Sequence, residues 1–116
     1  MLYVEPSEAT WAWFAGLFEG EGSLVLHRSN RWRCRFQIKT SDEEVAHLAH
    51  DRIGGRVFCP YAYRSSDGHP RKPFWIWVSD GLNPVQMSQR MWPWLGDRRR
   101  TKLRAFGLEP VAGEGP

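Results

Sequence analysis

The sequence has only two cysteines among its 116 residues, Cys34 and Cys59. Two are too few for the disulfide framework of many small secreted domains, so both are expected to be reduced, buried thiols. Long hydrophobic runs are also missing: the longest, Trp11 to Phe18, has eight residues, whereas about 20 are needed to span a bilayer. The sequence opens without a charged and then apolar leader, and the expected location is therefore the cytoplasm, without secretion.

Lysine is scarce in this sequence. Thirteen of its 16 basic residues are arginine, and with 13 acidic residues the net charge is +3. The planar guanidinium of arginine suits phosphate groups and the edges of guanine. The basic residues also cluster, and two clusters in one basic protein favour a nucleic-acid partner. One cluster is Arg28, Arg31, Arg33, Arg35 and Lys39, and the other is Arg98, Arg99, Arg100, Lys102 and Arg104.

Length and local patterns predict one α+β domain. With 41% hydrophobic residues, the chain has enough material for one modest core. The predicted order is helix, hairpin, helix, hairpin, helix, helix, which is typical of helices on one face of an antiparallel sheet. The domain is expected to span 1–106, followed by a flexible tail over 107–116. The expected elements are a helix over 7–19 ended by left-handed Gly20 and Gly22, strands over 24–28 and 31–39, a helix opened by a Ser41–Glu44 capping box and stopped at Gly54-Gly55, strands over 56–64 and 74–79, a helix over 83–94, and a short helix from Asp97.

The clearest local pattern is a strict alternation from residue 31 to residue 39. Period-two alternation places successive side chains on opposite faces of a sheet, so one set is expected in the core and the other outside. The outer set contains no acidic residue. A solvated sheet face normally carries both signs of charge, so this set favours a face that binds DNA. The inner set is Trp32, Cys34, Phe36 and Ile38, and the outer set is Arg31, Arg33, Arg35, Gln37 and Lys39.

The last strand carries two tryptophans on one face. Trp75 and Trp77 share this face, and the apolar residues that alternate with them share the other. Helices on one side of the sheet would leave the opposite side, with its cations and these tryptophans, open to a partner. The alternative is that both tryptophans are partly buried beneath the long loop over 65–73.

The first predicted helix breaks two local rules. Small residues recur at Ala12, Gly16 and Gly20, although glycine in mid-helix costs about 1 kcal/mol against alanine. Such a stripe lets another backbone approach closely. Glu19 and Glu21 lie at the C-terminal end, where the macrodipole is already negative, so a cation is needed there. Two local rules broken in one place indicate a functional site.

The run from Phe14 to Ser23 resembles the motif of the LAGLIDADG homing endonucleases. It reads FAGLFEGEGS, and seven of its positions keep the residue or residue type of that motif. The elements predicted over about 7–106 also follow the αββαββα order of the family. The resemblance implies a saddle-shaped antiparallel sheet that sits in the DNA major groove, with helices on one face.

The resemblance implies roles for individual residues. Glu21 matches the metal-binding acid, as a glutamate where the family name has aspartate, and Gly20 matches the position whose carbonyl lies beside the metal. Glu19 matches the first, structural acid of the motif. Arg98 matches a basic residue near the scissile phosphate, which the family usually fills with lysine, and Lys39 lies near a position that orients water. The implied catalytic residues are therefore Glu21, Arg98 and Lys39, with Mg²⁺, or another divalent cation such as Mn²⁺, as cofactor.

A single copy of the motif implies, in this family, a homodimer joined through the motif helix. The implied partner is double-stranded DNA with a long pseudo-palindromic site, and no membrane is involved. The implied interface residues are Ala12, Ala15, Gly16, Glu19 and Gly20. The expected DNA contacts are Arg28, Arg31, Arg33, Arg35, Gln37, Lys39, Arg64, Arg71, Lys72, Trp75, Trp77, Arg99 and Arg100.

The implied function is sequence-specific double-strand DNA cleavage, by hydrolysis of one phosphodiester in each strand. Two other classes stay open. The same fold without cleavage would be a nucleic-acid-binding protein, either an intron RNA maturase or a DNA-binding regulator. An interaction domain, whose aromatic first helix only mediates assembly, would have no affinity for nucleic acid at low salt.

Overall fold

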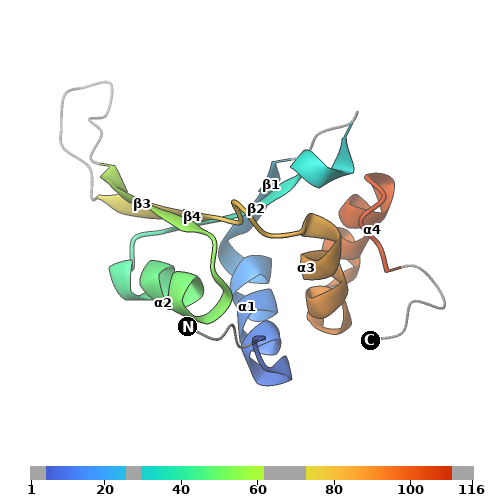
Figure 1. Ribbon diagram of the computed structural model, residues 1–116, viewed down its shortest axis with the longest axis horizontal. Coiled ribbons are helices and arrows are strands. Elements are labelled where there is room, and N and C mark those ends of the chain that lie inside the picture. Colours follow the sequence, from blue (N-terminus) through green and yellow to red (C-terminus); the bar gives the residue numbers. More distant parts are fainter. Residues whose placement is uncertain (1–4, 26–29, 62–72, 111–116) are drawn as a thin grey trace.

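The computed structural model describes residues 5–25, 30–61 and 73–110 of the chain (Figure 1). Their helices and strands follow the predicted order, with two short 3₁₀ turns added. The elements are α1 (Glu8–Glu21), β1 (Gly22–Val25), η1 (Arg31–Arg33), β2 (Arg35–Thr40), α2 (Glu43–Ile53), β3 (Arg56–Tyr61), β4 (Phe74–Val78), α3 (Pro84–Met91), η2 (Trp92–Trp94) and α4 (Asp97–Ala105).

The four strands form one antiparallel sheet in the order β1-β2-β4-β3, and the helices gather on one side of it (Figure 1). The predicted α+β class is confirmed. β2 lies inside the sheet, where Ile38 pairs with Gly22 of β1 and with Trp77 of β4. The face that carries Ile38 meets the helices. The opposite face is here called the open face.

α1 lies beneath the middle of the sheet and supplies the aromatic centre of the core (Figure 1). Phe14 meets Trp77 with ring centroids 5.0 Å apart, and Phe18 meets Phe36 at 5.2 Å, both edge-to-face. All four side chains are fully buried. Each such pair adds about 0.5–1.5 kcal/mol beyond the area that it buries. α1 is apolar nearly all round because α2 flanks it on one side and α3 on the other.

The predicted exposure of the tryptophan face of β4 is wrong. Trp77 pairs with Ile38 on the helix-covered face, is fully buried, and donates a hydrogen bond from Nε1 to the Gly54 carbonyl at 2.7 Å. Trp75 shares that face and is half-buried. The alternation could not decide between the faces because both faces of β4 are apolar. Ile76 lies on the open face instead.

The predicted strand over 31–39 begins four residues late. Residues 31–33 form a 3₁₀ turn, in which the Asn30 side chain accepts a hydrogen bond from Trp32 N and the Asn30 carbonyl accepts one from Arg33 N, both at 3.0 Å. Asparagine favours such local bonding over a strand ladder. Trp32 is therefore 56% exposed and not in the core, whereas Cys34, Phe36 and Ile38 are buried as predicted.

Helix ends agree with the sequence at Ser7, Asn83 and Gly54 and differ at two others. Ser7 caps α1 and Asn83 caps α3, as expected. The N-cap of α2 is Asp42, whose side chain accepts bonds from two backbone N–H groups, and not Ser41. α1 runs to Glu21, and Gly22 is extended, with φ −86°, and not left-handed. Glycine is required there because a Cβ would lie 2.5 Å from the Phe18 carbonyl oxygen.

The packed domain continues past the predicted boundary at residue 106. Leu108 is fully buried, and its backbone N–H donates to the Leu103 carbonyl at 3.0 Å. Arg104 and Glu109 form an ion pair at 2.8 Å. Residues 107–110 therefore close over the end of α4, and the remainder of the predicted tail lies outside the described residues.

Cys34 is buried, as predicted, while the side chain of Cys59 lies outside the described part of the chain. Among the described helices, none combines the length and the apolar character needed to cross a bilayer.

Truncation of Trp77 tests the position of the core. We expect Trp77→Ala to lower the free energy of unfolding by about 3–5 kcal/mol, because it leaves a cavity against Phe14 and frees the Gly54 carbonyl. Trp32→Ala, at an exposed tryptophan, should change it by about 0.5 kcal/mol or less. Urea unfolding followed by circular dichroism measures both values. Equal effects of the two substitutions would contradict this packing.

Candidate nucleic-acid interface

The open face combines positive charge with apolar side chains. The strand register places Gln37 and Arg56 on either side of Val78. Arg35 and Lys39 flank Gln37 on the same face of β2, and both are exposed. None of the described strand residues is acidic. Three predicted contacts, Arg35, Gln37 and Lys39, thus share the face of the sheet opposite the described helices, as the alternation predicted.

Aromatic rings lie beneath two of these cations. Lys39 Nζ is 4.2 Å from the ring centroid of Phe74, and the Arg56 guanidinium carbon is 4.5 Å from that of Phe58. A cation over an aromatic face is stabilised electrostatically, while its alkyl stem covers apolar surface. The open face therefore accommodates aromatic side chains because basic residues shield them from water.

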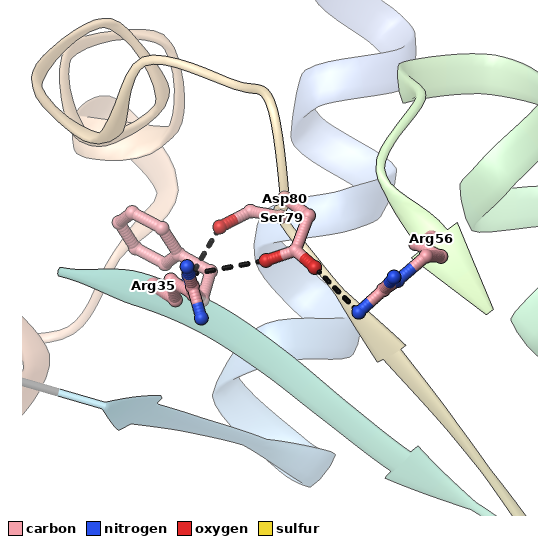
Figure 2. A network of polar contacts seen from close by, with 5 residues as sticks. Arg35, Arg56, Ser79 and Asp80 are labelled. Carbon is pink, nitrogen blue, oxygen red and sulfur yellow. Dashed lines mark hydrogen bonds and ion pairs between the residues drawn. The ribbon is translucent and has the colours of Figure 1, made fainter. Parts of the chain in front are cut away.

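Asp80 follows β4 and meets two arginines at the end of the open face (Figure 2). Its Oδ1 lies 3.1 Å from Arg35 Nε, and its Oδ2 lies 3.0 Å from Arg56 Nη2. Ser79, just before it, is fixed to β2, because Ser79 Oγ accepts from Phe36 N at 2.9 Å and Ser79 N donates to the Phe36 carbonyl. Sequence reasoning missed both Arg56 and Asp80 as members of this surface, since their contact depends on strand order.

The C-terminal end of α1 is met by Arg99 of α4. Arg99 Nη2 donates to the carbonyls of Gly22, at 2.6 Å, and Phe18, at 3.3 Å, and the guanidinium lies 4.7 Å from the Phe18 ring centroid. This is the cation that the two glutamates at this helix end led us to expect. Partial burial lowers the pKa of Arg99, neighbouring Arg98 lowers it further, and Glu19 raises it. Arginine titrates so high that the group stays charged.

Glu19 makes the converse contact. Its carboxylate accepts a hydrogen bond from the backbone N–H of Gly96, the N-cap residue of α4, which has no side chain of its own to cap the helix. A carboxylate at a helix N-terminus is favoured by the macrodipole. A glutamate of the same chain thus supplies the anion at the start of α4. Glu19 and Arg99 together form what we call the reciprocal cap.

The second basic cluster divides into internal and exposed members. Arg100 donates from Nε and Nη2 to the Trp92 carbonyl, at 3.0 and 2.7 Å. Arg99 and Arg100, both predicted to contact DNA, are thus half-buried and bonded to backbone carbonyls of their own chain. Arg98 and Lys102 are exposed.

The three residues predicted to be catalytic lie on elements that meet at the end of α1. Glu21 is its last residue and is exposed. Gly22 pairs with Ile38, so Glu21 and Lys39 flank the same rung of the sheet. Arg99 joins the start of α4 to this helix end, and Arg98 precedes it. The topology thus brings together the three elements that carry the predicted acid, Glu21, and the two predicted cations, Lys39 and Arg98.

The donor set at this helix end suits a hard divalent cation. The Glu21 carboxylate and the Gly20 carbonyl supply oxygen, the ligand atom that Mg²⁺ prefers. Mg²⁺ commonly keeps several waters and takes only one or two carboxylates together with substrate phosphate oxygens. The described residues contain no group of three or more His, Cys, Asp or Glu that could hold a metal alone. Of the residues predicted to hold a metal, the chain thus supplies one carboxylate and one carbonyl oxygen.

The predicted dimer surface of α1 is partly available. Adding a Cβ at Gly16 or Gly20 would meet nothing within 4 Å, and Ala12 is half-buried. Ala15 is fully buried in the core, so its assignment to a dimer interface is wrong: it lies on the side of α1 that packs within the chain. Glu19 is engaged in the reciprocal cap.

The remaining predicted DNA contacts lie off the sheet or outside the described residues. Arg33 is exposed in η1 and not on a strand. The side chain of Arg31 lies outside the described part, as do the residues Arg28, Arg64, Arg71 and Lys72.

No family model matches the chain, and no curated protein matches it. Among solved structures, it is similar to the archaeal intron-encoded homing endonuclease I-Vdi141I in its complex with DNA. The two share 14% sequence identity with a TM-score of 0.40, over 87% of this chain. The matched part spans 61% of the length of that endonuclease chain.

Loss of the reciprocal cap should destabilise the fold. We expect Arg99→Ala to lower the free energy of unfolding by about 1.5–3 kcal/mol, because charged hydrogen bonds to two carbonyls are lost. Arg98→Ala, which removes the adjacent exposed arginine, should have an effect within about 0.5 kcal/mol. Chemical denaturation of both variants measures the difference. Equal stabilities of the two variants would contradict the capping role.

Proposed function

We propose that the protein is a double-strand DNA endonuclease of the homing-endonuclease type, acting as a homodimer with Mg²⁺. The observation that carries this proposal is the position of Glu21. An exposed carboxylate ends a helix with the LAGLIDADG-like motif, at the place where the sheet and the basic start of α4 meet. A carboxylate that can hold a metal, together with cations that offset phosphate charge, is a combination that supports phosphodiester hydrolysis.

DNA would lie along the open face. Arg35, Gln37 and Lys39 project from alternate positions of one strand, and strands of this kind can follow the major groove. Arginine and glutamine offer paired hydrogen bonds to guanine and adenine edges, respectively, while lysine favours phosphate. A face with three cations among its exposed side chains attracts the duplex before any base is read.

Cleavage would take place at the end of α1. Glu21 and the Gly20 carbonyl would hold Mg²⁺, which polarises the phosphate and makes its bound water acidic. Arg98 would stabilise the negative charge that grows on the phosphate oxygens, and Lys39 would help to orient water. Cutting both strands requires two such helix ends, which supports a dimer.

The dimer would form through the side of α1 that bears Gly16 and Gly20. Glycines on that side allow two helix backbones to approach closely. Each glycine inside the helix costs about 0.5–1 kcal/mol relative to alanine, and contact with a second chain offsets this. Two copies crossing there would bring their Glu21 carboxylates to neighbouring positions.

Substitution of Glu21 tests the cleavage step. Duplexes are first selected by binding from a randomised pool and then incubated with Mg²⁺. We expect the wild type to cut both strands and EDTA to stop it. Glu21→Gln should lower the cleavage rate by at least about 10²-fold while leaving the affinity within about threefold, because only the metal-holding charge is lost.

Glu44→Gln, at an exposed glutamate of α2, serves as the matched control and should cut normally. Full activity of Glu21→Gln would overturn the assigned metal site. A wild type that binds the selected duplex but cuts it with neither Mg²⁺ nor Mn²⁺ would instead identify a non-cleaving DNA-binding protein.

Substitution of Gly16 tests the dimer. The site has room for a side chain within the monomer, so Gly16→Leu should fold and gain helix propensity of about 0.5–1 kcal/mol. It should nevertheless sediment as a monomer at concentrations where the wild type is a dimer. His47→Leu, at an exposed position of α2, is the control. A wild type that stays monomeric with and without DNA would refute the proposed assembly.

A further inference from the structure

Asp80 places negative charge within a basic surface. Its side chain is 26% exposed, and those of Arg35 and Arg56 are 57% and 61% exposed. Ion pairs between groups as exposed as these arginines contribute little to folding stability. A carboxylate here also weakens the attraction of the open face for phosphate. Neither stability nor general affinity for DNA accounts for its position.

Strand order explains how one carboxylate reaches both arginines. Arg35 comes from β2 and Arg56 from β3, and β4 lies between these strands. Neighbouring strands are about 4.8 Å apart, so the two backbones are separated by nearly 10 Å. The bonds between Ser79 and Phe36 continue the β2–β4 ladder, which sets Asp80 opposite Arg35. Figure 2 shows the carboxylate between the two side chains.

The atoms in contact with Asp80 leave the terminal edge of the Arg35 guanidinium available. Arg35 meets Asp80 through Nε, so its terminal edge, with both Nη groups, is the part left for a ligand. Asp80 Oδ1 is buried and accepts no aligned hydrogen bond, so this contact is an ion pair that orients the guanidinium by charge. The terminal edge of arginine matches O6 and N7 of guanine in the major groove.

We propose that Asp80 is a positioning residue for base readout, which holds Arg35 and Arg56 so that Arg35 recognises a guanine. The inference rests on the proposed DNA-binding function. A free arginine loses much side-chain freedom on binding, and an arginine already oriented by a carboxylate loses less. The same charge lowers affinity for every sequence alike. Asp80 therefore raises the preference for the cognate duplex while lowering general affinity.

The test compares the wild type with Asp80→Asn on two duplexes. One is a sequence selected from a randomised pool, and the other carries A·T in place of the preferred G·C pair. A single arginine–guanine contact discriminates by about 5- to 150-fold. We expect Asp80→Asn to lose at least about fivefold of this ratio, with equal or higher affinity for random duplex. Fluorescence anisotropy over a series of salt concentrations measures both quantities.

Asp51→Asn is the matched control, since it makes the same chemical change at an exposed position on α2. It should keep the full preference. If Asp80→Asn raises affinity for all duplexes and keeps the preference, Asp80 acts only as a charge and the inference is overturned. Weaker binding to all duplexes with a lower melting temperature would also overturn it, in favour of a structural role.

Arg35→Gln provides a second variant with Asp80 intact. It should lose the same guanine preference, and an unchanged preference would overturn the inference even if Asp80→Asn does not fold. A wild type that binds no duplex at low salt would remove the proposed function together with this inference. Binding and cutting by the wild type, with an unaltered preference in Asp80→Asn, would overturn the inference alone.

Discussion

The rest of the structure depends on how the last backbone carbonyls of α1 obtain hydrogen-bond donors. The chain passes from Glu21 directly into β1, so the helix has no room for a terminating turn, and its last carbonyls need a donor from elsewhere. Arg99, 77 residues beyond Gly22, supplies it, and Glu19 returns a carboxylate to the start of α4. Each helix thus supplies a side chain that forms hydrogen bonds with the backbone at the end of the other. This fixes α4 against α1, sets the direction in which β1 leaves, and keeps Glu21 outside the contact.

The reciprocal cap also changes how the basic charge of the chain is understood. Three consecutive arginines follow Asp97 in the first turn of α4, yet Arg99 and Arg100 bond backbone carbonyls of their own chain, and of the three only Arg98 is exposed. A basic residue counted in the sequence is therefore not always exposed to a partner. The open face behaves in the same way, since its arginines meet Asp80 before they meet any ligand. Over the described residues, these arginines therefore present less positive charge to a partner than their number in the sequence indicates.

Much of the fold could be predicted, because caps and alternation are local signals. The order of elements, the cap at Ser7 and the burial of Phe36 needed only nearby residues. The face of Trp77 could not be predicted, since both faces of its strand are apolar and only the helix layer distinguishes them. The candidate site divides in the same manner: the motif marks Glu21, whereas the pairing of Asp80 with two arginines follows from the order of the strands, which no local pattern encodes.

In the proposed DNA-binding function, the ion pairs of Asp80 would affect the time that the protein spends on any one duplex. Guanidinium groups engaged with a carboxylate displace fewer counterions from DNA, so contacts with unrelated sequence are weaker and shorter-lived. Rapid release lets a protein sample many positions by sliding and hopping within the time that one long-lived contact would occupy. In the proposed DNA-binding function, a carboxylate at the end of a basic sheet would thereby shorten each contact with unrelated sequence.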